Sequence, residues 1–252
     1  MRNKWKLLIP VFILAALAGA FLLYTGSYYH ADASALAALA SDEGVSVTST
    51  DYGWLFDGPS ETDALIFYPG AKVEEAVYAP LLHRLAAQGM DVCLVRMPYR
   101  LAFFGISKAS VLMDQYDYPH WYIGGHSLGG AMAARYAAGH ADRLTGVILL
   151  AAYPTKALDS ALSVVTLYGS EDGVLNRSKL EAGRGYLPES ARETVIEGGN
   201  HAQFGNYGPQ AGDGQAAISG LEQQRLTVEE ILQNVFVTEE KDESVLSPAG
   251  AV

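Results

Sequence analysis

The sequence predicts an α/β protein with a doubly wound, mostly parallel β-sheet. Short apolar runs recur along the chain with helix-forming segments between them, and βαβ units produce this alternation. A glycine-rich pentapeptide, Gly125–Gly129, follows one of these runs and precedes an alanine-rich segment. The runs are Ala64–Tyr68, Val92–Val95, Trp121–Ile123, Val147–Ala151, Val164–Tyr168 and Thr194–Ile196.

Two β-prone stretches precede the first run. Val45–Thr50 and Tyr52–Phe56 alternate weakly and lie close together, so they predict an antiparallel hairpin. Glu75–Gln88 is the clearest helix, because its apolar residues form a stripe that stops before a glycine. Further helices are expected over Leu128–Gly139 and within Gln215–Val237.

The spacing of the elements leaves little room for additions to the sheet. Only about ten residues separate Ala152 from Ser163, so we expect no large cap domain and an open site. The chain divides into a membrane anchor or signal segment at 1–24, a linker at 25–44, an α/β domain at 45–237 and a flexible acidic tail at 238–252.

The charge and the cysteine and histidine content of the chain argue against several classes of function. The chain has 252 residues and a formal net charge of −11, which argues against a nucleic-acid partner. Cys93 is the only cysteine, and its apolar surroundings predict a buried thiol. The six histidines include no pair spaced as H-x-H or H-x-x-x-H, so we expect neither a metal site nor a cofactor. The oligomeric state is left open.

Residues 7–24 carry no charge and are long enough, at about 27 Å as a helix, to cross a bilayer. Arg2, Lys4 and Lys6 precede them, and no Lys or Arg follows before Lys72. The positive-inside rule therefore predicts a single-pass protein of the cell membrane with its main domain outside the cytoplasm. The alternative is a cleaved signal and secretion, with Ala31–Ala33 as the cleavage site.

Ser127 is the central residue of the pentapeptide GHSLG, between a predicted strand and a predicted helix. In that setting the motif exposes a serine oxygen at the end of a parallel sheet, as a nucleophile elbow does. Gly125 and Gly129 suit the elbow, since a side chain at either position would crowd the strand and the helix. The alternative is that Ser127 is the N-cap of an ordinary helix.

A serine nucleophile needs a base that is itself oriented by a carboxylate. Asp172 and His201 each follow the end of a predicted strand, where ligands bind in open α/β sheets. Glu171 is the competing acid. We choose Asp172 because its shorter side chain is held more rigidly and because Gly173 permits a turn toward the histidine loop. His126 is interpreted as structural, with a side chain that points elsewhere.

The oxyanion that forms during attack needs two backbone donors. The N–H of Leu128, directly after the nucleophile, is expected to be one. The N–H of Ala71 is expected to be the other, because Gly70 lets the loop after Ala64–Tyr68 approach a substrate closely. A plain turn before a helix is the alternative for Pro69–Gly70.

Four segments carry a resemblance to a known family: Tyr68–Val73, Gly125–Gly129, Gly169–Gly173 and Gly198–Gly205. Together they resemble the α/β-hydrolase superfamily, and more closely a bacterial subfamily of small, often membrane-anchored hydrolases of the fold-5 type. The resemblance covers residues 45–237 and implies an α/β-hydrolase fold with serine esterase-type hydrolysis. It also implies that the loop Gln203–Asp213 closes over one side of the site.

The sequence thus predicts a carboxylesterase-like serine hydrolase that acts on a small ester through an acyl-enzyme intermediate. Ser127 would attack, His201 would carry the proton and Asp172 would orient the imidazole. A thioester, lactone or amide substrate fits the same triad. A catalytically inactive cell-surface binding module of the same fold is the alternative from another class.

Overall fold

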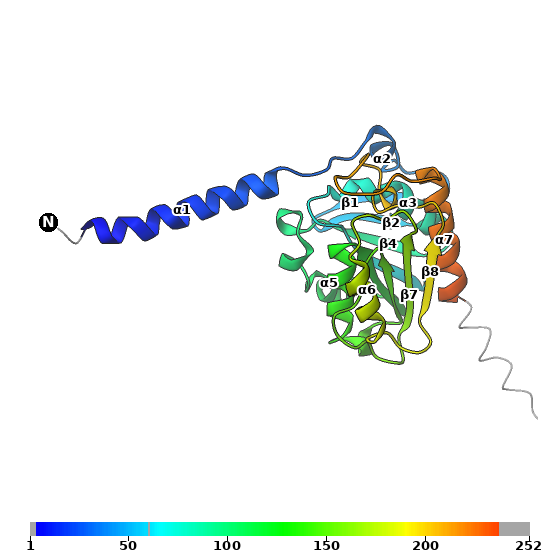
Figure 1. The fold of residues 1–252 in the computed structure, drawn as a ribbon. Coiled ribbons are helices and arrows are strands. Elements are labelled where there is room, and N and C mark those ends of the chain that lie inside the picture. Colours follow the sequence, from blue (N-terminus) through cyan, green and yellow to red (C-terminus); the bar gives the residue numbers. More distant parts are fainter. Residues whose placement is uncertain (1–3, 60, 237–252) are drawn as a thin grey trace, which may run out of the picture.

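The computed structural model describes residues 4–59 and 61–236 and contains an eight-stranded sheet (Figure 1). The strand order is β1-β2-β4-β3-β5-β6-β7-β8. β1 and β2 form an antiparallel hairpin that joins β4, and β3 to β8 run parallel. The strands are β1 (Ser46–Thr50), β2 (Gly53–Asp57), β3 (Asp63–Tyr68), β4 (Asp91–Val95), β5 (His120–His126), β6 (Gly146–Leu150), β7 (Ser163–Gly169) and β8 (Arg192–Ile196).

The sheet has a hydrophobic core on each face. Along β3, Leu65 and Phe67 face the core beneath α3 and α7, whereas Ile66 and Tyr68 face the core beneath α4 and α5. Burial on both faces explains why the central strands are continuous apolar runs. The doubly wound, mostly parallel sheet is confirmed. The helices are α1 (Lys4–Gly26), α2 (Ala33–Ala37), α3 (Ala79–Ala87), α4 (Lys108–Gln115), α5 (Leu128–Ala137), α6 (Arg177–Arg184) and α7 (Gly220–Phe236).

The predicted helix over Glu75–Gln88 is divided in two. Glu75–Tyr78 forms a short 3₁₀ turn, and α3 begins at Ala79. Pro80 lies in the first turn of α3, where its missing N–H removes no helical hydrogen bond. The apolar stripe was therefore predicted correctly, but proline fixes the start of the α-helix one turn later.

The connection from β6 to β7, residues 151–162, contains neither helix nor strand. Across residues 4–59 and 61–236 the structure has no large cap domain, as expected from the short spacing. The acidic tail predicted at 238–252 lies outside the described residues.

The segment 25–44, expected to be a linker, contains the short helix α2 and contacts the domain. Tyr29 forms an isolated parallel bridge with Val73, and its N–H donates to the Lys72 carbonyl at 2.8 Å. Asp32 caps α2 by accepting a hydrogen bond from the Ala35 N–H, and Ala35 itself is fully buried. Small side chains and satisfied backbone groups let this segment lie on the domain. α1, in contrast, projects away from the fold (Figure 1).

Candidate active site

Ser127 lies at the sharp turn between β5 and α5. Its φ of 54° and ψ of −122° are unusual for a residue with a side chain. A Cβ on Gly125 would lie 2.3 Å from the Tyr68 carbonyl oxygen, and one on Gly129 would lie 2.0 Å from it, so both positions require glycine. Ser127 is at the N-cap position of α5, but its side chain makes no capping hydrogen bond. Helix capping therefore does not explain the hydroxyl.

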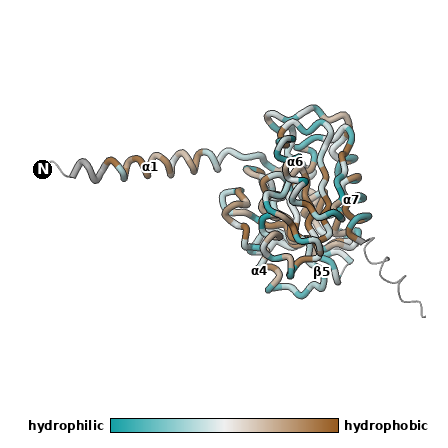
Figure 2. Tube along the Cα trace, turned by 60° about the horizontal axis from the view of Figure 1, so that its bottom comes forward, coloured by the Kyte–Doolittle hydropathy of each residue, from teal (hydrophilic) through white to brown (hydrophobic). Residues whose placement is uncertain are grey.

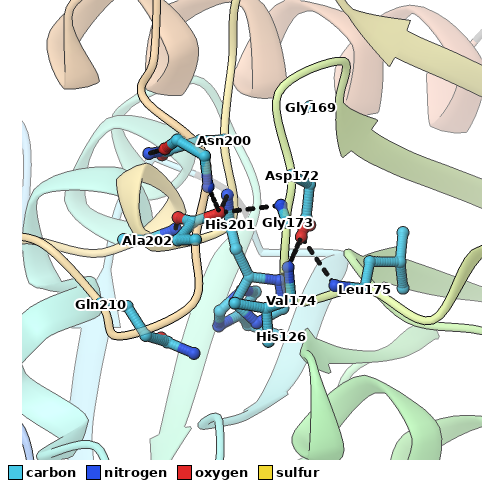
Figure 3. Close-up of polar contacts among 12 residues, drawn as sticks. His126, Gly169, Asp172, Gly173, Val174, Leu175, Asn200, His201, Ala202 and Gln210 are labelled. Carbon is cyan, nitrogen blue, oxygen red and sulfur yellow. Dashed lines mark hydrogen bonds and ion pairs between the residues drawn. The ribbon is translucent and has the colours of Figure 1, made fainter.

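Asp172 and His201 form a buried pair from the loops after β7 and β8 (Figure 3). The Nδ1–H of His201 donates to Asp172 Oδ2 at 2.8 Å. The other carboxylate oxygen accepts from the N–H groups of Val174, at 2.9 Å, and Leu175, at 2.7 Å. This arrangement leaves Nε2 of a neutral His201 as a hydrogen-bond acceptor.

The same contacts set the charge of Asp172. Burial by itself would raise the pKa of this carboxyl group, but the hydrogen bond and charge of His201 and the two loop amides outweigh burial, so the pKa is lowered. Asp172 is therefore a carboxylate at neutral pH. Glu171, one residue earlier, is exposed and accepts a hydrogen bond from the Ser170 hydroxyl at 3.0 Å.

A cavity of about 230 Å³ adjoins the serine. Ser127, Leu128 and His201 all line it, and Asp172 lies behind His201. Ala71 and the loop Gln203–Asp213 do not line it. The lining residues are Ser127, Leu128, Ala131, Ala151, Ala152, Tyr153, Val174, Leu175, Asn176 and His201.

The two expected oxyanion donors lie on segments that meet at the elbow. Leu128 is the first residue of α5, so its N–H has no acceptor within the helix. The loop that carries Ala71 passes close to the elbow, because a Cβ on Gly129 would lie 2.4 Å from the Pro69 carbonyl oxygen. Within the described part of the chain, no hydrogen bond uses the Ala71 N–H. Both donors remain predictions.

His126 packs behind the pair instead of pointing away from it. Its ring centroid lies 4.4 Å from that of His201, and Figure 3 shows the two rings together. Its Nδ1 lies 2.8 Å from the Tyr78 hydroxyl, which accepts a hydrogen bond from the Gly70 N–H at 3.0 Å. Burial, and then the nearby His201, hold the pKa of His126 well below its usual value, so His126 stays neutral.

Residues 64–225 match the family model described as the alpha/beta hydrolase family. The chain belongs to that family. Its fold, its chain order of Ser127, Asp172 and His201, and the strained elbow all agree with this assignment. No curated protein matches the chain in sequence at a significant level.

Solved structures share the hydrolase fold at low sequence identity. TT1662 from Thermus thermophilus is 14% identical with a TM-score of 0.55, and the match covers 76% of this chain and 98% of that one. Carboxylesterase CesB from Bacillus subtilis is 10% identical with a TM-score of 0.54, covering 81% and 95%. Dienelactone hydrolase from Anabaena variabilis is 13% identical with a TM-score of 0.54, covering 78% and 99%. These likenesses show the fold alone.

Asp213 is a further residue of the candidate site, and it was not identified from the sequence. Its carboxylate accepts hydrogen bonds from the N–H groups of His201, at 3.2 Å, and Ala202, at 2.8 Å. It also accepts from the Gly173 N–H at 3.1 Å. One side chain therefore ties the loop that carries Asp172 to the loop that carries His201.

Among residues 4–59 and 61–236 of this hydrolase, no group of three or more His, Cys, Asp and Glu side chains could hold a metal ion. The buried Asp172–His201 pair is instead satisfied by hydrogen bonds within the protein.

Proposed function

We propose that this hydrolase cleaves carboxylic esters through an acyl-enzyme intermediate, with Ser127 as the nucleophile. One observation carries the proposal: Ser127, on a strained turn, lines the same small cavity as a histidine that is hydrogen-bonded to a buried carboxylate. Strain of this kind persists where the surrounding structure enforces it, and it is concentrated at functional sites.

The mechanism follows from the roles that each group can fill. His201 Nε2 accepts the proton of the Ser127 hydroxyl as the oxygen attacks the ester carbonyl, and then gives that proton to the leaving alcohol. Asp172 holds the imidazole in the required tautomer and stabilises the imidazolium. Water repeats the sequence on the acyl-enzyme and releases the acid.

The negative charge on the carbonyl oxygen is stabilised by the N–H groups of Leu128 and Ala71. Leu128 supplies a donor at the N-terminus of α5, where the helix dipole adds to the effect. The Tyr78 hydroxyl accepts from the Gly70 N–H at 3.0 Å and thereby supports the loop that presents Ala71.

Other substrates fit the same triad. Two similar folds belong to proteins described as a carboxylesterase and a dienelactone hydrolase, and thioesters and amides undergo the same attack. A binding module without activity is the alternative outside enzymes. A fluorophosphonate probe separates the two, because it phosphonylates only an activated serine. Labelling of the native chain that is absent from Ser127→Ala supports the proposal, and an unlabelled native chain contradicts it.

Asp213→Ala should lower kcat by about 10- to 100-fold with little change in KM, because misplacement of catalytic groups by about 1 Å is costly. The free energy of unfolding should also fall by about 1–3 kcal/mol, since N–H groups lose their acceptor. Steady-state kinetics and urea unfolding measure both effects. Asp213→Asn keeps one acceptor oxygen and should retain more activity. Asp117→Ala, at an exposed aspartate, is the control, and equal loss in both alanine variants would contradict the positioning role.

Short acyl chains should be the better substrates. The cavity beside Ser127 holds about 230 Å³, and no cap supplies a further apolar wall over the described residues. Typical ligand cavities are about 300–1,000 Å³. A series of p-nitrophenyl esters should therefore give the highest kcat/KM at the acetate or butyrate, and a maximum at about ten carbons or more would contradict this expectation.

The hydrolase is also proposed to be a single-pass membrane protein with its domain outside the cytoplasm. The stretch Ile9–Gly26 of α1 has the length and composition to cross a membrane, although a signal sequence near the N-terminus would have the same properties. Protease added to spheroplasts should digest the domain, given the positive charges before the span. Protection until lysis would reverse the topology, and release into the medium would indicate cleavage.

A further inference from the structure

Three exposed aromatic residues lie in the connection between β4 and α4. Tyr99 is 52% exposed, Phe103 is 63% exposed and Phe104 is 48% exposed. Residues 98–104 are named the aromatic loop here. Neighbouring apolar side chains of this size are normally buried, because exposing apolar surface to water costs free energy. An exposed group of them therefore marks an interaction site.

The aromatic loop contacts α1 at Phe21, before the C-terminal end of the stretch Ile9–Gly26 that could cross a membrane. The ring of Phe21 lies 5.1 Å from that of Tyr99 and 6.0 Å from that of Phe104, measured between centroids. Phe21 is five residues before Gly26, where the stretch Ile9–Gly26 ends. At 1.5 Å per residue it lies about 7.5 Å inside that end. Amphipathic segments bound to a membrane surface bury their apolar side chains to about 5–10 Å, which is the same depth.

We infer that the aromatic loop is a docking surface for the bilayer that α1 enters. The inference rests on the proposed membrane location of α1 but not on the proposed chemistry. Rings that contact Phe21 cannot avoid the bilayer when Ile9–Gly26 spans it. Tyrosine is enriched at the boundary between lipid and water, and phenylalanine is among the apolar residues that membrane-surface segments bury in it. Figure 2 shows hydrophobic residues both along α1 and on the part of the fold nearest to its end.

Two cations border the aromatic loop. The guanidinium of Arg100 lies 3.3 Å from the centroid of the Tyr28 ring, and Lys72 Nζ lies 4.2 Å from the centroid of the Tyr24 ring. Tyr24 lies two residues before the end of the stretch Ile9–Gly26 and Tyr28 two residues beyond it, so the two cations lie near the boundary of the bilayer when this stretch spans it. Basic side chains at that level are attracted to anionic headgroups. From Phe21 to Tyr28 the contacts of the chain change from aromatic rings to cations, in the order in which hydrocarbon gives way to headgroups at a bilayer surface.

The backbone presents the rings in a fixed arrangement. The N–H of Arg100 donates to the Met97 carbonyl at 3.0 Å, and the N–H of Phe104 donates to the Leu101 carbonyl at 3.0 Å. The Arg100 carbonyl in turn accepts from the Lys72 N–H at 2.9 Å, next to Ala71. The aromatic loop follows β4 at the carboxyl edge of the sheet, which is also the edge of the candidate site. Docking therefore brings that edge close to the bilayer surface.

The test uses the full chain in nanodiscs of phosphatidylcholine and phosphatidylglycerol. Cys93 is fully buried, so Phe103→Cys can carry a single bimane label, and one label per chain also reports folding. Lipids with a nitroxide near the top of the acyl chain should quench more than about half of the bimane emission. Leu221→Cys is the control, because Leu221 is 60% exposed at the start of α7, and α7 lies on the side of the fold opposite to α1 (Figure 1).

Strong quenching at position 103 with little at position 221 supports docking. Equal quenching at the two positions overturns it. Quenching by a nitroxide carried on a second Phe103→Cys chain, but not by labelled lipid, would identify a contact between copies and also overturn it. The measurement uses no turnover, so its outcome is independent of whether Ser127 is the nucleophile.

Discussion

The Ser127→Ala variant is expected to lose essentially all ester hydrolysis while it stays folded. Removing the nucleophile of a comparable triad lowers kcat by about 10⁶-fold, because the remaining groups act only together with it. Hydrolysis of p-nitrophenyl acetate by the purified variant measures the loss. Among the described residues that line the cavity, Ser127 is the only serine or threonine, so no second hydroxyl of that kind can replace it. Any remaining rate should come from substrate binding and the oxyanion donors alone.

The structure explains why this substitution should spare the fold. The Ser127 side chain makes no capping hydrogen bond, so alanine removes no stabilising contact at the helix start. Alanine has the same difficulty as serine with a φ of 54°, so the strain of the turn is unchanged. Thermal unfolding should therefore be close to native. Ser160→Ala, at an exposed serine in the loop before β7, is the matched control and should keep full activity. Native turnover in Ser127→Ala would contradict the assignment.

Most of the sheet could be predicted because its central strands are buried on both faces and are therefore continuous apolar runs. β5 runs three residues further than its apolar run, through Gly124 and Gly125 to His126. Glycine carries no apolar signal, yet a Cβ on Gly124 would lie 2.6 Å from the Ile148 carbonyl oxygen of β6. The apolar pattern therefore could not predict the last part of β5, where close packing against β6 requires glycine. α6 was missed for another reason, since only Leu180 and Gly183 of it are buried.

The candidate site also contains residues that the sequence predicts and residues that it cannot predict. Ser127, Asp172 and His201 could be proposed because each follows a strand and the order is diagnostic. Asp213 could not, because a carboxylate that accepts from backbone N–H groups of other loops leaves no periodic trace in the sequence. The place of His126 against His201 was also missed, since it depends on how the loop after β8 folds back over β5.

Asp172→Asn is expected to lower kcat by about 10⁴-fold, as the equivalent change does in the serine-protease template. Asp172 Oδ2 accepts from His201 Nδ1 at 2.8 Å, and an amide in its place can present an N–H there instead. His201 would then carry its proton on Nε2 and could not accept the serine proton. The charge that stabilises the imidazolium would be lost as well.

The acid side of the stability profile should change in the same variant. The folded-state pKa of Asp172 is lowered, so its ionisation stabilises the fold above the pKa of the unfolded chain, about 3.9, and this stabilisation is lost as the pH falls through the folded-state value. Asp172→Asn removes that contribution. Urea unfolding at several pH values should therefore show a shallower decline toward acid for the variant than for the native chain.

Glu171→Gln is the matched control and should change kcat by less than about tenfold, because an exposed carboxylate supplies little energy to a buried site. Both substitutions replace an acid with its amide, and the two residues are adjacent, so a general effect on the loop would appear in both. Only Asp172 reaches His201. The opposite result, a large loss of kcat in Glu171→Gln and near-normal kcat in Asp172→Asn, would contradict the assignment. The loop after β7 would then have to rearrange during catalysis, and Glu171 would be the acid that orients His201.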